Sequence, residues 1–145
     1  MQLFVTIPAI NELEFIPGVL ADLAKQEYRD FTLLVCVNQP EEWWNDESKR
    51  DICKNNVATL DYVKSFCEMH NISLILQDKC SRGNGWTERQ GGVGWARKTL
   101  MDAVEAIADD DDVIVSLDAD TRVETNYLAE IAKQFAVFQK ASAMA

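Results

Sequence analysis

Short apolar runs alternate along this chain with longer segments in which apolar residues recur at helical spacing. The short runs are nearly continuous, which is typical of strands buried on both faces of a parallel sheet. Their length and their β-branched residues favour strands over buried helices. They predict four strands, at residues 3–9, 31–37, 72–76 and 113–117.

Each predicted strand is followed by a segment with helical periodicity. Asn11 and Glu14 resemble a capping box, with Asn in the role of Ser or Thr, so the first helix is expected to follow this cap and to run to about Gln26. The apolar positions that repeat along the first helix are Ile16, Leu20 and Leu23. The other helices are predicted over about 48–69, with Cys53, Val57, Leu60, Val63 and Cys67 on one face, over 95–108, and in a last segment marked by Leu128, Ile131, Phe135 and Phe138.

This alternation of strands and helices defines the expected fold class. Strand and helix follow each other four times, which predicts an α/β domain with a mostly parallel sheet. The buried character of the strands requires helices on both faces, in a three-layer α/β/α arrangement. Residues 79–94 interrupt the pattern with glycine and charge, and they are interpreted either as a flexible loop or as a lid that contacts a phosphate group.

Composition narrows the class of protein. The chain has 145 residues, 48% of them hydrophobic, which is enough for one domain with its own core. The net charge is -10, from 24 acidic and 14 basic residues. Such an excess of negative charge disfavours nucleic-acid binding and binding to anionic membrane surfaces.

Cysteines and hydropathy address compartment and metal content. The four cysteines form no Cys-x-x-Cys pair and there is a single histidine, so a zinc site is not expected. Buried, reduced thiols and a cytoplasmic location are expected instead. No basic segment follows Met1 and no apolar run approaches the roughly 20 residues of a membrane span. A signal peptide or membrane span is therefore not expected in this chain, while a longer parent that associates with the cytoplasmic side of a membrane stays open.

The strongest chemical signal follows the last predicted strand. The apolar run 113–117 leads directly into Asp118 and Asp120, two carboxylates one residue apart. Oxygen ligands in such a pair suit Mg²⁺ or Mn²⁺, which commonly also holds a substrate phosphate. The pattern favours phosphate or nucleotide chemistry, and the other interpretation is an ordinary acidic turn after a strand.

Polar residues follow the other strands as well. Asn11 and Glu12 come after the first strand, and Asn38 and Gln39 follow the second. Asp78, after the third strand, could join them. The carboxyl ends of parallel strands lie along one edge of the sheet, where α/β proteins bind their ligands, so these groups are expected to converge there.

Four segments in this order resemble the family 2 glycosyltransferases. They are residues 5–12 (VTIPAINE), 38–40 (NQP), 92–98 (GVGWARK) and 117–120 (LDAD). The resemblance covers about residues 3–139. It implies the GT-A type of Rossmann-like fold and a glycosyltransferase that binds a nucleotide-diphospho-sugar and a metal.

The resemblance also implies roles for individual residues. Asn38 would face the base, Arg97 would lie near the donor phosphates, and Asp118 would contact the ribose or the donor sugar. Asp120 would bind the metal, Mn²⁺ or Mg²⁺. The residues expected to line the nucleotide pocket are Pro8, Ala9, Asn11 and Glu12.

In this family a sugar passes from a nucleoside diphosphate, here of the UDP or GDP type, to a hydroxyl of an acceptor saccharide or lipid. Residues 1–140 would form the donor-binding domain and 141–145 a tail. The acceptor half of the family follows the Asp-x-Asp, and only 25 residues follow Asp120. Glu124 and Glu130 are poor candidates for the general base, which is expected to be absent, so the chain looks truncated.

Three other interpretations use the same residues. A haloacid-dehalogenase-like phosphatase would use Asp118 as its nucleophile and Asp120 as its general acid. A phosphoreceiver domain would need an acid pair after the first strand, which Asn11 and Glu12 match poorly. A non-catalytic nucleotide-binding module would bind the same ligand without transfer.

Overall fold

The computed structural model describes residues 1–87 and 91–144, without the side chains of 92–93 and 138–144. The strands are β1 (Leu3–Ala9), β2 (Phe31–Asn38), β3 (Ser73–Lys79) and β4 (Val113–Ser116). The α-helices are α1 (Ile16–Ala24), α2 (Arg50–Met69), α3 (Gly92–Glu105) and α4 (Tyr127–Met144). Two 3-10 helices, η1 (Glu41–Asn45) and η2 (Glu47–Lys49), precede α2.

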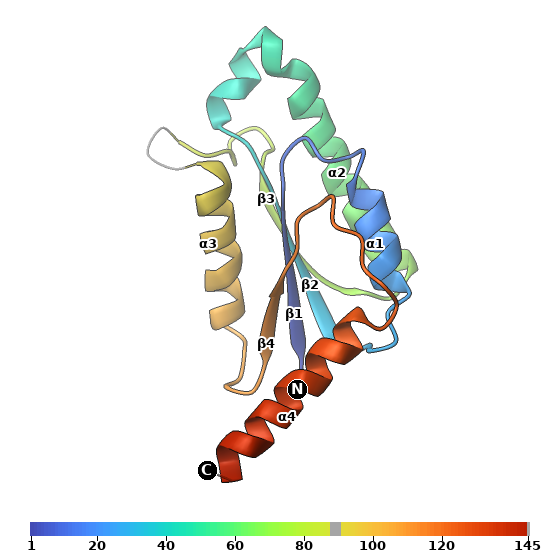
Figure 1. Cartoon of the computed structure of the whole chain (residues 1–145). Helices are drawn as coiled ribbons and strands as arrows, with labels where there is room; N and C mark the ends of the chain where they lie inside the picture. Colours follow the sequence, from blue (N-terminus) through green and yellow to red (C-terminus); the bar gives the residue numbers. More distant parts are fainter. Residues whose placement is uncertain (88–90, 145) are drawn as a thin grey trace.

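The four strands form one parallel sheet in the order β3-β2-β1-β4 (Figure 1). The chain adds β2 and then β3 on one side of β1, and places β4 on the other side. β1 is therefore the strand at which the direction of winding reverses. In open α/β sheets the space beyond the carboxyl ends of the two strands at such a reversal is the usual ligand site.

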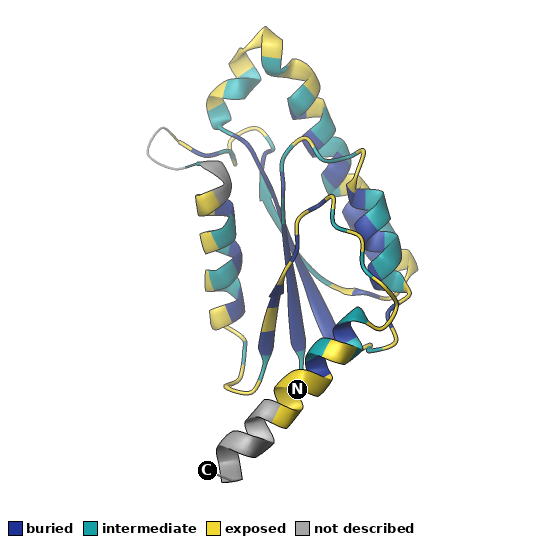
Figure 2. Ribbon diagram, in the orientation of Figure 1, coloured by how far each residue is buried: buried dark blue, intermediate teal, exposed yellow. Residues whose placement is uncertain are grey.

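Helices cover both faces of the sheet, which confirms the predicted three-layer arrangement. α1, α2 and α4 pack on the larger core, in which Val5, Ile7 and Val35 have no exposed surface. α3 covers the other face, where Leu100 and Val104 pack against Phe4 and Leu34 (Figure 1). β1 and β2 are buried along almost their whole length because they lie between these layers (Figure 2).

The start of the first helix differs from the predicted capping box. α1 begins at Ile16 with Phe15 as its cap, and no side chain caps it. Asn11 instead has a positive φ of 56° and lies in the loop between β1 and α1. Asn tolerates this conformation better than most residues, so the Asn signal marked a turn in place of a helix cap.

Other boundaries also shift. β3 extends to Lys79, so Asp78 lies inside the strand and not after it. α3 starts earlier than predicted, and α4 continues through residues that were expected to form the tail. The apolar stripe of α4 is shorter than expected because Phe135 is 43% exposed. Of the loop 79–94, residues 88–90 lie outside the described residues.

The four cysteines are buried and unpaired, as predicted. Burial raises the pKa of the Cys67 thiol to about 11, so this group stays protonated at neutral pH. Among the helices of residues 1–87 and 91–144, none combines the length and apolar character that crossing a bilayer requires.

A buried polar network fixes the loop after β1. The Asn56 side chain on α2 has no exposed surface, and its Oδ1 accepts a hydrogen bond from the backbone N–H of Asn11 at 2.8 Å. Its Nδ2 donates to Gln39 Oε1 at 2.9 Å, and Gln39 Nε2 donates to Cys53 Sγ at 3.2 Å. α2 thereby joins the ends of β1 and β2 at the edge where the ligand groups were expected.

A second anchor fixes the loop after β3. Asp78 Oδ1 accepts hydrogen bonds from the backbone N–H groups of Cys80 at 3.0 Å and Ser81 at 2.9 Å, and Oδ2 accepts from Asn84 at 3.2 Å. Burial alone would raise the pKa of this carboxyl, but the bonds from Ser81, Cys80 and Asn84 outweigh it and lower the pKa of Asp78 to about 2.

We predict that Asn56→Ala lowers the free energy of unfolding by about 1–3 kcal/mol, because it leaves buried hydrogen-bonding groups without a partner. Urea unfolding at pH 7 measures the change. The control is Lys54→Ala on the exposed side of the same helix, for which a change within about 0.5 kcal/mol is expected. Equal stability of the two variants would refute the role of the network.

We predict that Asp78→Asn destabilises the chain by roughly 1–2 kcal/mol at pH 7, after allowance for solvent screening. The folded-state pKa lies below the ordinary value of 3.8, so the stabilisation is complete above about pH 4 and disappears as the pH falls towards 2. Thermal unfolding between pH 7 and pH 2.5 should show the wild type and the variant converging, whereas exposed Asp110→Asn should change little. A difference that stays constant with pH would contradict this assignment.

Candidate functional site

A pocket of about 260 Å³ lies at the carboxyl ends of β1 and β4, where the winding of the sheet reverses. β1 and the loop after it supply one wall, the Asp-x-Asp supplies the other, and α3 and β2 each add one residue. Its lining residues are Pro8, Ala9, Ile10, Glu12, Asn38, Arg97, Asp118, Ala119 and Asp120. The pocket thus includes seven of the eight residues to which the family resemblance assigned a role in binding the donor or the metal, all except Asn11.

The pairing of β4 with β1 brings the Asp-x-Asp to the pocket. The backbone N–H of Leu117 donates to Thr6 O at 2.9 Å, which continues the ladder past the last residue of β4. Burial then alternates along the chain: Leu117 and Ala119 are buried, and Asp118 and Asp120 are exposed. The inward apolar residues hold the segment to the core and leave both carboxylates outside it.

α3 places a cation against this segment. Arg97 Nη2 lies 2.9 Å from Asp118 Oδ1, and the two side chains are 43% and 64% exposed. This contact contributes little stability because both groups face water. Its importance is positional, since it holds a guanidinium at the rim of the pocket, where an anionic group would meet it.

Glu12 faces the two aspartates from the other wall. Burial raises the pKa of Glu12 above its ordinary value, and the negative charges of Asp120 and Asp118 raise it further. Three carboxyl groups thus influence one another across the pocket. A cation bound between these carboxylates would reduce the repulsion among their negative charges.

Asn38 lines the pocket from the end of β2, and it is only 3% exposed. Its Nδ2 donates to the carbonyl oxygen of Ala9 at 3.1 Å, and its Oδ1 accepts from Trp86 Nε1 at 3.1 Å. Asn38 therefore ties the ends of β1 and β2 together and fixes the buried indole beside them.

Three polar residues of the predicted edge do not line the pocket. Asn11 is turned by its positive φ and is held by α2 through its backbone. Gln39 is fully buried in the polar network below. Asp78 lies on β3, which β2 separates from β1, and it anchors the loop that follows its own strand.

Ile10 and Ala119 were not predicted, although both line the pocket. Each lies within a motif that was recognised, between residues with predicted roles, so adjacency was the available signal. Trp86 was also missed as a support of Asn38, because its position follows from a loop whose course the sequence pattern does not define.

The chemistry of the donor set suits a divalent cation that is shared with a ligand. Within the described part of the chain, no group of three or more His, Cys, Asp or Glu residues is arranged to enclose a metal ion. Mg²⁺ in nucleotide sites typically takes only one or two protein carboxylates and completes its shell with phosphate oxygens and water. Asp120 and Asp118 fit this second arrangement.

Comparison with known proteins gives matches among solved structures alone. No protein-family model matches the sequence, and no curated protein matches it. The structure matches S. aureus TarS 1–349 in complex with UDP-GlcNAc with a TM-score of 0.61 and 18% sequence identity, over 92% of this chain and 30% of that one. It matches TarS 1–349 in complex with UDP equally well, with a TM-score of 0.61 and 18% identity over 92% of this chain and 31% of that one.

The likeness concerns the fold. This chain spans less than a third of the length of those TarS chains. Within that span the parallel sheet and its helical layers agree, as the TM-score shows. The chain therefore has the GT-A type of Rossmann-like α/β fold, similar to that of the TarS structures.

Proposed function

We propose that this chain is the donor-binding part of a glycosyltransferase and that its pocket binds a nucleoside-diphosphate sugar together with Mn²⁺ or Mg²⁺. The parent enzyme would transfer the sugar to a hydroxyl of an acceptor saccharide or lipid. The observation that supports the proposal is the pocket of about 260 Å³ at the point where the winding of the sheet reverses. Its walls are formed by apolar residues, the Arg97 guanidinium and the Asp-x-Asp.

The lining residues divide into two chemical halves. Pro8, Ala9 and Ile10 offer an apolar wall and a backbone that suit the flat face of a nucleoside. Arg97 offers charged N–H donors for phosphate oxygens. Asp118 offers oxygen acceptors for the hydroxyl groups of a ribose or a donor sugar.

Asp120 is the residue that would hold the cation, with Asp118 beside it on the same wall of the pocket. A divalent cation in this position supplies positive charge to the diphosphate that leaves when the sugar is transferred. Arg97 adds a second positive group on the α3 side of the pocket. The apolar wall excludes water from the nucleoside side, which strengthens these charge interactions.

One finding favours a UDP-type donor. The TarS structures that share the fold were solved with UDP-GlcNAc and with UDP. The amide of Asn38, which lines the pocket, could bond to a uracil or a guanine edge if its present bonds to Ala9 and Trp86 were exchanged for ligand bonds, so it does not select between the two. Titration with UDP and GDP distinguishes the two bases.

We predict that the 145-residue chain binds UDP in the presence of Mn²⁺ and that Asp120→Ala weakens this binding by about 10–100-fold, because a charged metal ligand is lost. Isothermal titration calorimetry with UDP and with GDP, with and without Mn²⁺, measures the affinities. Asp110→Ala, in the exposed acidic run far from the pocket, is the matched control and should bind as the wild type does. Failure of the wild type to bind either nucleotide under any of these conditions would sink the proposal.

Arg97 provides a separate test of the phosphate half of the site. Arg97→Ala should weaken UDP binding by about 10–100-fold through loss of charge-assisted hydrogen bonds, while uridine should bind both proteins equally. Lys98→Ala removes the neighbouring cation, whose Nζ is held by Asp102 at 2.8 Å, and is expected to leave UDP binding intact. If Arg97→Ala weakens uridine and UDP to the same extent, the guanidinium does not act on the phosphates.

A further inference from the structure

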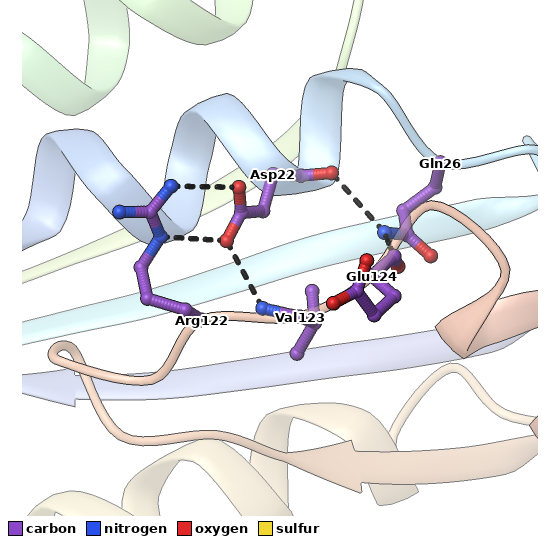
Figure 3. Close-up of polar contacts among 5 residues, drawn as sticks. All are labelled: Asp22, Gln26, Arg122, Val123 and Glu124. Carbon is purple, nitrogen blue, oxygen red and sulfur yellow. Dashed lines mark hydrogen bonds and ion pairs between the residues drawn. The ribbon is translucent and has the colours of Figure 1, made fainter.

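The segment that carries Asp120 is fastened to α1, far from it in sequence. Asp22 of α1 accepts hydrogen bonds from Arg122 Nε at 2.8 Å and from Arg122 Nη2 at 3.1 Å (Figure 3). The same carboxylate accepts a bond from the backbone N–H of Val123 at 3.0 Å. The Asp22 side chain is 13% exposed and that of Arg122 is 68% exposed, so the carboxylate is shielded from water while the guanidinium lies at the surface.

Gln26 lies four residues after Asp22, just beyond the end of α1. It is 3% exposed, and its Nε2 donates to the carbonyl oxygen of Glu124 at 2.7 Å and to that of Asp22 at 3.1 Å (Figure 3). Its Oε1 accepts from the backbone N–H of Leu128 at 3.0 Å. The buried amide of Gln26 thus binds a backbone carbonyl at Glu124 and a backbone N–H at Leu128, and it fixes the segment between β4 and α4 at two points.

Gly18 adds an independent indication that α1 is shaped for this contact. A Cβ at Gly18 would lie 3.3 Å from Arg122 Cδ and 3.4 Å from its Nε. Glycine inside a helix costs about 0.5–1 kcal/mol relative to alanine. Its presence here leaves room for the Arg122 side chain to lie against the helix.

The Asp-x-Asp itself lies in a tight turn that Asp118 and Thr121 close. Thr121 donates its backbone N–H to the carbonyl oxygen of Asp118 at 3.0 Å, and its Oγ1 accepts from the Asp118 N–H at 3.2 Å. Asp120 lies within this turn, two residues before Arg122, whose side chain contacts Asp22. Within the described part of the chain, the Asp120 carboxylate accepts no hydrogen bond, so its position depends on how its backbone is held.

We propose that Asp22 and Gln26 are positioning residues for the candidate site: α1 and the loop that follows it set the place of the Asp120 carboxylate by binding the backbone and the arginine that come after Asp120. The proposal rests on the proposed function, because it assigns a purpose to a site that would bind a metal and a nucleotide. Residues that orient metal ligands from behind commonly change metal affinity by about 10–100-fold when they are replaced.

The test uses the 145-residue chain and three variants. Asp22→Ala removes the whole contact, and Arg122→Ala removes the guanidinium while it leaves α1 and the bond to Val123 in place. Both should weaken Mn²⁺-dependent UDP binding by about tenfold or more. Asp22→Asn keeps one oxygen that can accept from Val123 and from Arg122 Nε, but it loses the charge and the acceptor for Arg122 Nη2, so its affinity should lie between those of Asp22→Ala and the wild type.

Amide hydrogen exchange without ligand gives a second readout. In Asp22→Ala the amides of Asp118 and Thr121 should exchange about tenfold faster, although neither is bonded to Asp22, because the turn loosens once its far end is released. Val63→Ala, on the buried face of α2, is the matched control for general destabilisation. It should lower the melting temperature while Asp118 and Thr121 keep their exchange rates and the chain keeps its UDP affinity.

These readouts separate the two proposals. A wild type that binds no nucleotide overturns the proposed function, and the exchange data then decide alone whether α1 positions the turn. Exchange that accelerates only at Val123, or UDP affinity that falls equally in Val63→Ala, overturns the positioning role. If Asp22→Ala does not fold, Arg122→Ala with unchanged exchange and unchanged UDP affinity overturns it as well.

Discussion

The parallel pairing of β1 with β2 on one side and with β4 on the other is the constraint on which the site depends. It aligns the carboxyl ends of three strands, and it makes β1 the strand at which the winding reverses. Side chains that are distant in sequence meet at this edge of the sheet because the hydrogen-bond ladders fix the register of the strands that carry them. Pro8 and Ala9 belong to β1 itself, and the pairing of β4 with β1, which continues to Leu117, fixes the position of Asp118.

The strands and the pocket could be predicted because each depends on a local signal. Continuous apolar runs mark buried strands, and the bounds of β1 were correct to the residue. The topological rule for parallel sheets then places the residues after those strands at one edge. No comparable rule predicted that Ile10 and Ala119 line the pocket, because their side chains carry no polar group that would indicate a binding role.

The remaining features depend on contacts between distant segments. The conformation of Asn11 follows from its bond to Asn56 on α2, and nothing near Asn11 in the sequence distinguishes this turn from a helix cap. The same holds for Asp22 and Arg122, which resemble ordinary surface charges when each is considered on its own helix or loop. Tertiary structure gives these residues their roles, so they become visible only once the segments are placed together.

The glycine at position 18 carries a consequence for how such a chain can change over generations. While Arg122 lies across α1, a larger side chain at position 18 meets the arginine before it meets solvent. A shorter residue at position 122 would remove that obstacle and would also remove the partner of Asp22. Positions 22 and 122 are therefore coupled through their direct contact, and among related sequences they are expected to be replaced together or retained together, while position 18 is expected to stay small wherever the arginine is kept.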